Sequence, residues 1–76
     1  MSTIFKVRAR RAKDGTPVQA FVTIGGTAWQ GYTLTNGEYV TVEMSQTGMY
    51  DYTAKYDGRT VDSGRREGGF LEIIIP

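Results

Sequence analysis

Apolar and polar residues alternate along most of the chain, which is the pattern of a half-buried β-strand. The alternation is clearest between Gly48 and Gly58, where Tyr50, Tyr52 and Tyr56 share one face. Mostly polar residues occupy the other face of the same stretch. The pattern predicts a central strand whose tyrosines face the core.

Similar stretches along the rest of the chain predict further strands. With the tyrosine strand, they cover residues 3–11, 18–24, 28–34, 38–44, 50–56, 59–63 and 70–75. Turn-forming residues recur between them at about ten-residue spacing, and no window keeps a helical period. The sequence therefore predicts one all-β domain over residues 1–76, a six- to seven-stranded antiparallel β-sandwich.

The first predicted strand is apolar on one face and basic on the other. We expect Phe5, Val7 and Ala9 to enter the core, and Lys6, Arg8 and Arg10 to form a solvated row of positive charge.

Glycine marks several predicted turns. Asn36-Gly37 and Asp57-Gly58 can both adopt the positive φ angles of a type I′ turn, so each predicts a hairpin. Gly31 lies inside a predicted strand, which indicates a bulge or a close backbone approach.

The last third of the chain changes from polar to apolar. The stretch 59–63 is typical of an edge strand, and the glycine-rich stretch 64–69 is expected to be the most flexible loop. The stretch 70–75 is apolar on both faces except at Glu72, so it is either central in a sheet or covered by a partner.

Composition limits the chemistry that the chain can perform. The 76 residues include no cysteine and no histidine, which removes disulfides, thiolate metal sites and the usual general base. The carboxylates are spread through turns and solvent faces without paired spacing, and the glycine-rich stretch lacks the residues of a phosphate-binding loop. We expect neither an enzyme nor a bound cofactor or metal.

Charge is unevenly distributed although the formal net charge is only +1. The first 13 residues hold five of the nine basic residues and none of the eight acidic ones. No basic segment followed by an apolar run predicts a signal peptide, and no apolar run is long enough to span a membrane. We expect a chain that is made and left in the cytoplasm of its producer.

Four different short motifs lie between residues 13 and 56. They are Asp14-Gly15-Thr16-Pro17-Val18, Ala20-Phe21-Val22-Thr23-Ile24, Leu34-Thr35-Asn36-Gly37-Glu38-Tyr39 and Gly48-Met49-Tyr50-Asp51-Tyr52-Thr53-Ala54. They resemble the turn, strand and hairpin motifs of immunoglobulin-like (Ig-like) and prealbumin-like β-sandwich modules, which include bacterial Ig-like domains, carboxypeptidase regulatory-like domains and Ig-like domains on phage virions. The resemblance implies that the tyrosine after Gly48 packs inward and bonds the backbone through its hydroxyl near a corner of the sandwich.

Two binding functions remain open beside the main hypothesis. The basic first strand, together with exposed aromatic residues, could track a nucleic acid backbone on a small β-barrel. The aromatic residues Trp29, Tyr32 and Tyr39 lie around one predicted hairpin and could form a platform for carbohydrate.

The resemblance favours a structural module that docks on a larger protein lattice. A phage capsid decoration protein, or another virion accessory protein that binds a major capsid or tail protein, is the leading hypothesis. It implies assembly in the host cytoplasm and leaves a homo-oligomer open. The predicted partner-binding residues are Lys6, Arg8, Arg10, Arg11, Lys13, Arg65, Arg66, Phe70 and Ile74.

Overall fold

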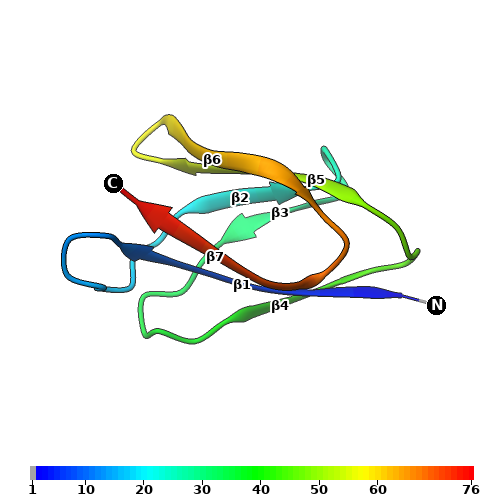
Figure 1. Ribbon diagram of the computed structural model, residues 1–76, viewed down its shortest axis with the longest axis horizontal. Helices are drawn as coiled ribbons and strands as arrows, with labels where there is room; N and C mark the ends of the chain where they lie inside the picture. Colours follow the sequence, from blue (N-terminus) through cyan, green and yellow to red (C-terminus); the bar gives the residue numbers. More distant parts are fainter. Residues whose placement is uncertain (1) are drawn as a thin grey trace.

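A computed structural model describes residues 2–76, and these fold into seven β-strands. The strands are β1 (Thr3–Arg11), β2 (Phe21–Ile24), β3 (Trp29–Tyr32), β4 (Val40–Met44), β5 (Tyr50–Tyr56), β6 (Arg59–Arg66) and β7 (Gly69–Ile75). They form a three-stranded sheet of order β4-β1-β7 and a four-stranded sheet of order β3-β2-β5-β6 (Figure 1). The all-β prediction is confirmed. No helix in the described part of the chain has the length and apolar character needed to cross a membrane.

The core lies between the two sheets and takes side chains from both. Alternation along β1 and β7 sends every second residue inward, as the period of two requires. The buried apolar set is Phe5, Val7, Ala9, Val18, Ala20, Val22, Ile24, Val42, Met44, Tyr52, Ala54, Leu71, Ile73 and Ile75. The inward face predicted for the first strand is therefore confirmed.

The tyrosine strand is β5, and it lies between β2 and β6 in the four-stranded sheet. Tyr52 is buried, and the half-buried Tyr50 packs its ring edge-to-face on Phe5 with 6.1 Å between centroids. The Tyr50 hydroxyl donates to the Gln46 carbonyl at 2.7 Å, as the family resemblance implies. The prediction of a central core strand is confirmed.

One strand pair departs from the predicted antiparallel pattern. β1 and β7 are parallel, with Phe5 opposite Gly69 and Arg11 opposite Ile75. These two strands come from opposite ends of the chain, so no hairpin fixes their relative direction. The three-stranded sheet is therefore mixed.

The two predicted hairpins have different outcomes. Asp57-Gly58 joins β5 to β6 with φ angles of 54° and 77°, which confirms that hairpin. The hairpin at Asn36-Gly37 is wrong, because β3 and β4 belong to different sheets. There the Asn36 side chain accepts a hydrogen bond from the Glu38 N–H at 2.9 Å, so an Asx turn guides the chain between the sheets.

Of the bulge and the close backbone approach predicted at Gly31, the bulge is wrong. β2 and β3 stay in regular register past this residue. A Cβ on Gly31 would lie 2.7 Å from the Trp29 indole, so the glycine makes room for that ring to fold back over its own strand.

The stretch 64–69 is not a flexible loop. β6 continues through Arg66, with Gly64 opposite Tyr52, and only Glu67 and Gly68 link it to β7. Gly68 has φ of 119°, and a Cβ there would lie 3.2 Å from the Ile4 carbonyl oxygen. Glycine therefore lets the chain cross between the sheets beside β1. As predicted, β6 lies at a sheet edge.

The last strand is not central in its sheet. β7 is an edge strand that pairs only with β1. Its outward residue Phe70 is 69% exposed, and Ile74 is 37% exposed. Of the two positions predicted for this apolar strand, the central one is wrong.

Candidate docking surface

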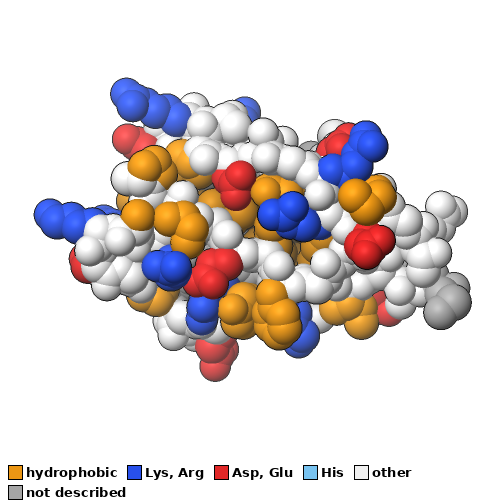
Figure 2. All heavy atoms as spheres, viewed as in Figure 1, with side chains coloured by type: hydrophobic (Ala, Val, Ile, Leu, Met, Phe, Trp, Pro, Cys, Tyr) orange, Lys and Arg blue, Asp and Glu red, His pale blue; other side chains and the backbone are white. Residues whose placement is uncertain are grey.

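The outer face of the three-stranded sheet gathers five of the nine predicted partner-binding residues. The parallel register places Lys6 beside Phe70, and Arg10 beside Ile74. Arg8 lies between them, opposite Glu72. Figure 2 shows basic, acidic and hydrophobic side chains next to one another along the band where Figure 1 places β1 and β7. We call this surface the β1/β7 face: Ile4, Lys6, Arg8, Arg10, Tyr39, Phe70, Glu72 and Ile74.

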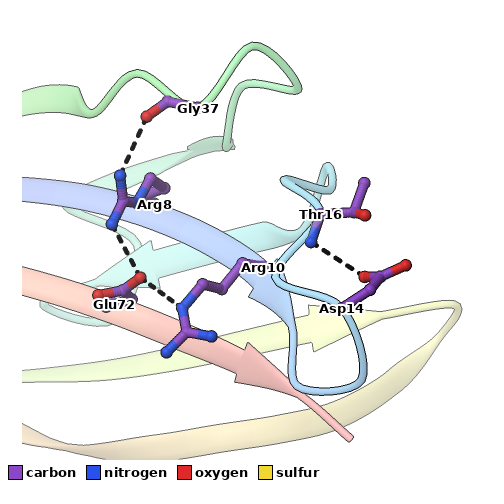
Figure 3. A network of polar contacts seen from close by, with 6 residues as sticks. All are labelled: Arg8, Arg10, Asp14, Thr16, Gly37 and Glu72. Atoms are coloured by element: carbon purple, nitrogen blue, oxygen red, sulfur yellow. Dashed lines mark hydrogen bonds and ion pairs between the residues drawn. The ribbon is translucent and has the colours of Figure 1, made fainter.

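Glu72 binds two of the arginines on this face. Its Oε1 accepts hydrogen bonds from Arg8 Nη2 at 2.9 Å and from Arg10 Nε at 2.7 Å (Figure 3). The bond from Arg10, which has the larger effect, and the bond from Arg8 hold the pKa of Glu72 below its ordinary value. The row of positive charge predicted for β1 is therefore partly neutralised by β7.

Arg8 is fixed on three sides. Besides Glu72, its Nη1 donates to the Gly37 carbonyl at 3.2 Å (Figure 3), and its guanidinium lies 4.4 Å from the centre of the Tyr39 ring. Its Nε is buried and has no hydrogen-bond partner. Only 28% of the side chain is exposed, so the prediction of a solvated Arg8 is wrong.

An aromatic pair connects this network to the exposed apolar residues. Tyr39 and Phe70 pack edge-to-face with 5.1 Å between ring centroids. Ile4 is 46% exposed on the same side of the sheet. The β1/β7 face therefore combines positioned cations with solvent-facing aromatic and aliphatic groups, which makes it the candidate docking surface.

The other four predicted partner-binding residues lie elsewhere. The nearby Tyr56 hydroxyl raises the pKa of Arg11, whose side chain is not on the outward side of β1. Lys13 is exposed in the turn after β1. Arg65 pairs with Asp51 in the four-stranded sheet at 2.9 Å, and Arg66 lies 5.6 Å from the Tyr52 ring centre. These four residues do not join the β1/β7 face.

The predicted carbohydrate platform is not assembled. Trp29 packs against the core, and Tyr39 contacts Arg8 and Phe70 on the β1/β7 face. Tyr32 belongs to the four-stranded sheet, where its ring lies 5.1 Å from that of Phe21. The three aromatic residues therefore lie in three separate parts of the molecule.

Sequence reasoning missed the partners that order the face. The sequence marks Glu72 only as the polar exception in an apolar strand, and it does not predict the roles of Tyr39 and Gly37 on this face. The signal was the spacing of charge: an acid in the middle of one outer row and arginines in the other. It becomes informative only once β1 and β7 are known to be neighbours.

A buried polar residue was missed as well. The Thr33 hydroxyl accepts from the Ala20 N–H and donates to the Val18 carbonyl, both at 2.8 Å. It joins the end of β3 to the segment before β2, so its role is to satisfy buried backbone groups.

Two shallow concavities lie on the surface of the described residues. One, of about 240 Å³, is lined by Phe21, Thr23, Thr53 and Lys55 on the four-stranded sheet. Another, of about 270 Å³, lies between the β5–β6 turn and the end of β7. Among residues 2–76 no three metal-ligating side chains gather at one place.

Comparison with known proteins gives no relative. No protein-family model, no curated protein and no solved structure matches the chain.

Proposed function

We propose that this protein is a non-enzymatic structural module that docks through its β1/β7 face on a larger protein lattice. A phage capsid or tail is the lattice that we favour, with the protein as a decoration or accessory subunit assembled in the host cytoplasm. One observation carries the proposal: a single sheet face combines exposed Phe70 and Ile74 with arginines held in place by Glu72.

Such a face has the composition of a protein interface. Aromatic residues and arginine are enriched at interfaces, and a few well-packed residues near the centre supply most of the binding free energy. Arg8 is already ordered by Gly37, Tyr39 and Glu72, so less side-chain entropy is lost when a partner binds. Exposed Lys6 adds a cation that favours an acidic partner.

The strand order supports the prealbumin-like alternative within the family resemblance. In the constant-type Ig arrangement the first two strands share a sheet. Here β1 and β2 lie in different sheets, and β1 pairs with β4 and β7. We therefore infer a prealbumin-like module, a fold that by itself does not determine function.

Co-sedimentation with phage capsids and tails stripped of accessory proteins tests the lattice proposal. We expect the protein to pellet with its lattice at low salt, and less of it to pellet as salt screens the cations. The double variant Phe70→Ser/Ile74→Ser should reduce binding by about tenfold or more, because it removes the exposed apolar centre.

The matched control is Tyr32→Ser. Tyr32 is 58% exposed but lies in the four-stranded sheet, so its loss should leave co-sedimentation unchanged. Failure of the protein to pellet with any lattice at any salt concentration would overturn the proposal. Equal weakening by Tyr32→Ser would assign docking to a different face.

A further inference from the structure

The four sheet edges of residues 2–76 differ in their protection against further strand pairing. β3 has only four residues, and β4 has five with Glu43 on its exposed side. β6 carries several charged residues, and Val61 is left unopposed because Ala54 pairs with Asp62 and Lys55 with Thr60. Short length, charge and bulges are the devices that keep an edge from pairing.

β7 has none of these devices except one charge. It is seven residues long, with Leu71, Ile73 and Ile75 in the core. Phe70 and Ile74 are apolar residues on its exposed side, and Glu72 is the single charged residue.

The outer edge of β7 also presents free backbone groups. The Ile75 carbonyl accepts from the Ala12 N–H, just beyond the end of β1, so Ile75 directs its backbone toward that strand. Successive residues of a strand direct these groups to opposite sides. Phe70, Glu72 and Ile74 therefore direct their N–H and C=O groups away from β1, ready to bond an added strand.

We propose that the strand added at this edge is β7 of a second copy of the chain, in antiparallel orientation about a two-fold axis at Glu72. Glu72 is the central residue of the strand, so this register pairs all seven residues. It sets Phe70 opposite Ile74 of the other copy on the outer face, and Leu71 opposite Ile73 on the inner face. Every pair of side chains beside the axis is then apolar.

Neighbouring registers lose this match. A two-fold axis at Ile73 sets Glu72 opposite Ile74, and an axis at Leu71 sets Glu72 opposite Phe70. Both place a carboxylate against an apolar side chain. Self-complementarity about the strand centre is what a symmetric dimer requires of one surface.

The charges at the axis are compatible with this pairing. Two Glu72 carboxylates face each other, and like charges directly opposite oppose pairing. Each carboxylate, however, is already bound by Arg8 and Arg10 of its own chain. Four guanidinium groups therefore surround two carboxylates. The dimer joins the three-stranded sheets of the two copies into one six-stranded sheet of order β4-β1-β7-β7-β1-β4.

Disulfide trapping tests the register. The chain has no cysteine, so each crosslink reports only on introduced residues. Phe70→Cys chains mixed with Ile74→Cys chains should form a crosslinked dimer, since residues opposite each other at a hydrogen-bonded pair are about 5.5 Å apart between Cα atoms, within disulfide reach. Neither variant alone should crosslink. The control mixes Lys6→Cys with Ile74→Cys chains, whose cysteines would lie two strands apart, about 10 Å, beyond disulfide reach.

Sedimentation equilibrium of the isolated chain measures the association itself. A small edge interface dimerises weakly, so we extend the measurement to about 1 mM protein. Ile74→Lys should weaken dimerisation by about tenfold or more, because a lysine protects the edge. Ile4→Lys, which adds the same charge on β1 of the same face, should leave it unchanged.

The outcomes separate this proposal from the lattice proposal, because no lattice is present. A monomer at all concentrations, or no crosslink in the mixture, would overturn dimerisation by β7. Crosslinking by Ile74→Cys alone would overturn the register about Glu72. Either result leaves docking on a lattice to be judged by co-sedimentation.

Discussion

The outer faces of the two sheets carry similar groups in different settings. The β1/β7 face has a Tyr39–Phe70 pair and the four-stranded sheet has a Phe21–Tyr32 pair, each with 5.1 Å between ring centroids. Each face also has an arginine–carboxylate bond of 2.9 Å, Arg8–Glu72 on one and Arg65–Asp51 on the other.

The surroundings of the two ion pairs differ. The side chains of Arg8 and Glu72 are 28% and 32% exposed, whereas those of Arg65 and Asp51 are 64% and 70% exposed. Glu72 binds a second arginine, Arg10, and Arg8 also stacks on Tyr39. Equal distances therefore do not mean equal stabilisation, because solvent screening and shared partners decide how much an ion pair contributes.

Removing the charge of Glu72 is the strongest test of this difference. We expect Glu72→Gln to lower the free energy of unfolding by about 1–2 kcal/mol at neutral pH, since hydrogen bonds to charged groups contribute more than neutral ones and this site is partly shielded. For a domain of this size that corresponds to a fall in Tm of roughly 4–16 °C. Thermal unfolding at a protein concentration where both chains are monomeric measures it; an unchanged Tm would show that the shared bonds contribute little.

Acid should remove the stabilisation that the ionised Glu72 contributes. The pKa of Glu72 is lowered in the folded chain by Arg10 and Arg8, so its contribution to stability is fully present above the unfolded pKa of about 4.5. It is lost as pH falls through the depressed folded pKa. The stability gap between the protein and Glu72→Gln should therefore stay constant from neutral pH down to about pH 5 and close below that. Urea unfolding across this range measures the gap; a gap that persists at pH 2 would assign it to packing rather than charge.

The difference in stability between the protein and Glu72→Gln isolates the titration of Glu72 from that of other carboxylates. Asp14 also has a lowered pKa, because the Thr16 backbone N–H bonds its carboxylate. That group is the same in both chains and cancels in the difference. The remaining pH dependence belongs to Glu72 and its arginines.

The sequence predicted the positions of the strands better than it predicted which strands pair with each other. Period-two alternation identified the inward residues of β1 and β5, because side-chain direction in a strand is a local property. The Asp57-Gly58 dipeptide identified the β5–β6 hairpin, because a turn motif is local as well. Local patterns carry no information about which sheet a strand joins.

That limit explains the errors in the fold. Asn36-Gly37 has hairpin chemistry, yet the chain there crosses between sheets, because β4 pairs with β1 rather than with β3. The glycines of 64–69 suggested mobility, but pairing of Gly64 and Arg65 with β5 holds that stretch in β6. In both cases strand pairing overrode the local preference.

The candidate docking surface shows the same division. The sequence predicted partner-binding residues on two separate strands: Lys6, Arg8 and Arg10 on one, Phe70 and Ile74 on the other. Their meeting on one face depends on the parallel β1–β7 pair, which no turn motif encodes. Arg65 and Arg66 were assigned to a flexible loop and instead lie in a paired strand.

Asp51→Asn is the smallest expected effect and makes the comparison quantitative. Asp51 and Arg65 are mostly exposed, and within residues 2–76 no third charged side chain joins their ion pair. Exposed pairs contribute about 0.2–1 kcal/mol, so we expect a loss of free energy of unfolding below about 0.5 kcal/mol and little change in Tm. The residual effect should vanish at about 1 M salt, where screening is complete over short distances. A loss equal to that of Glu72→Gln would mean that the 2.9 Å bond, rather than its surroundings, sets the stabilisation.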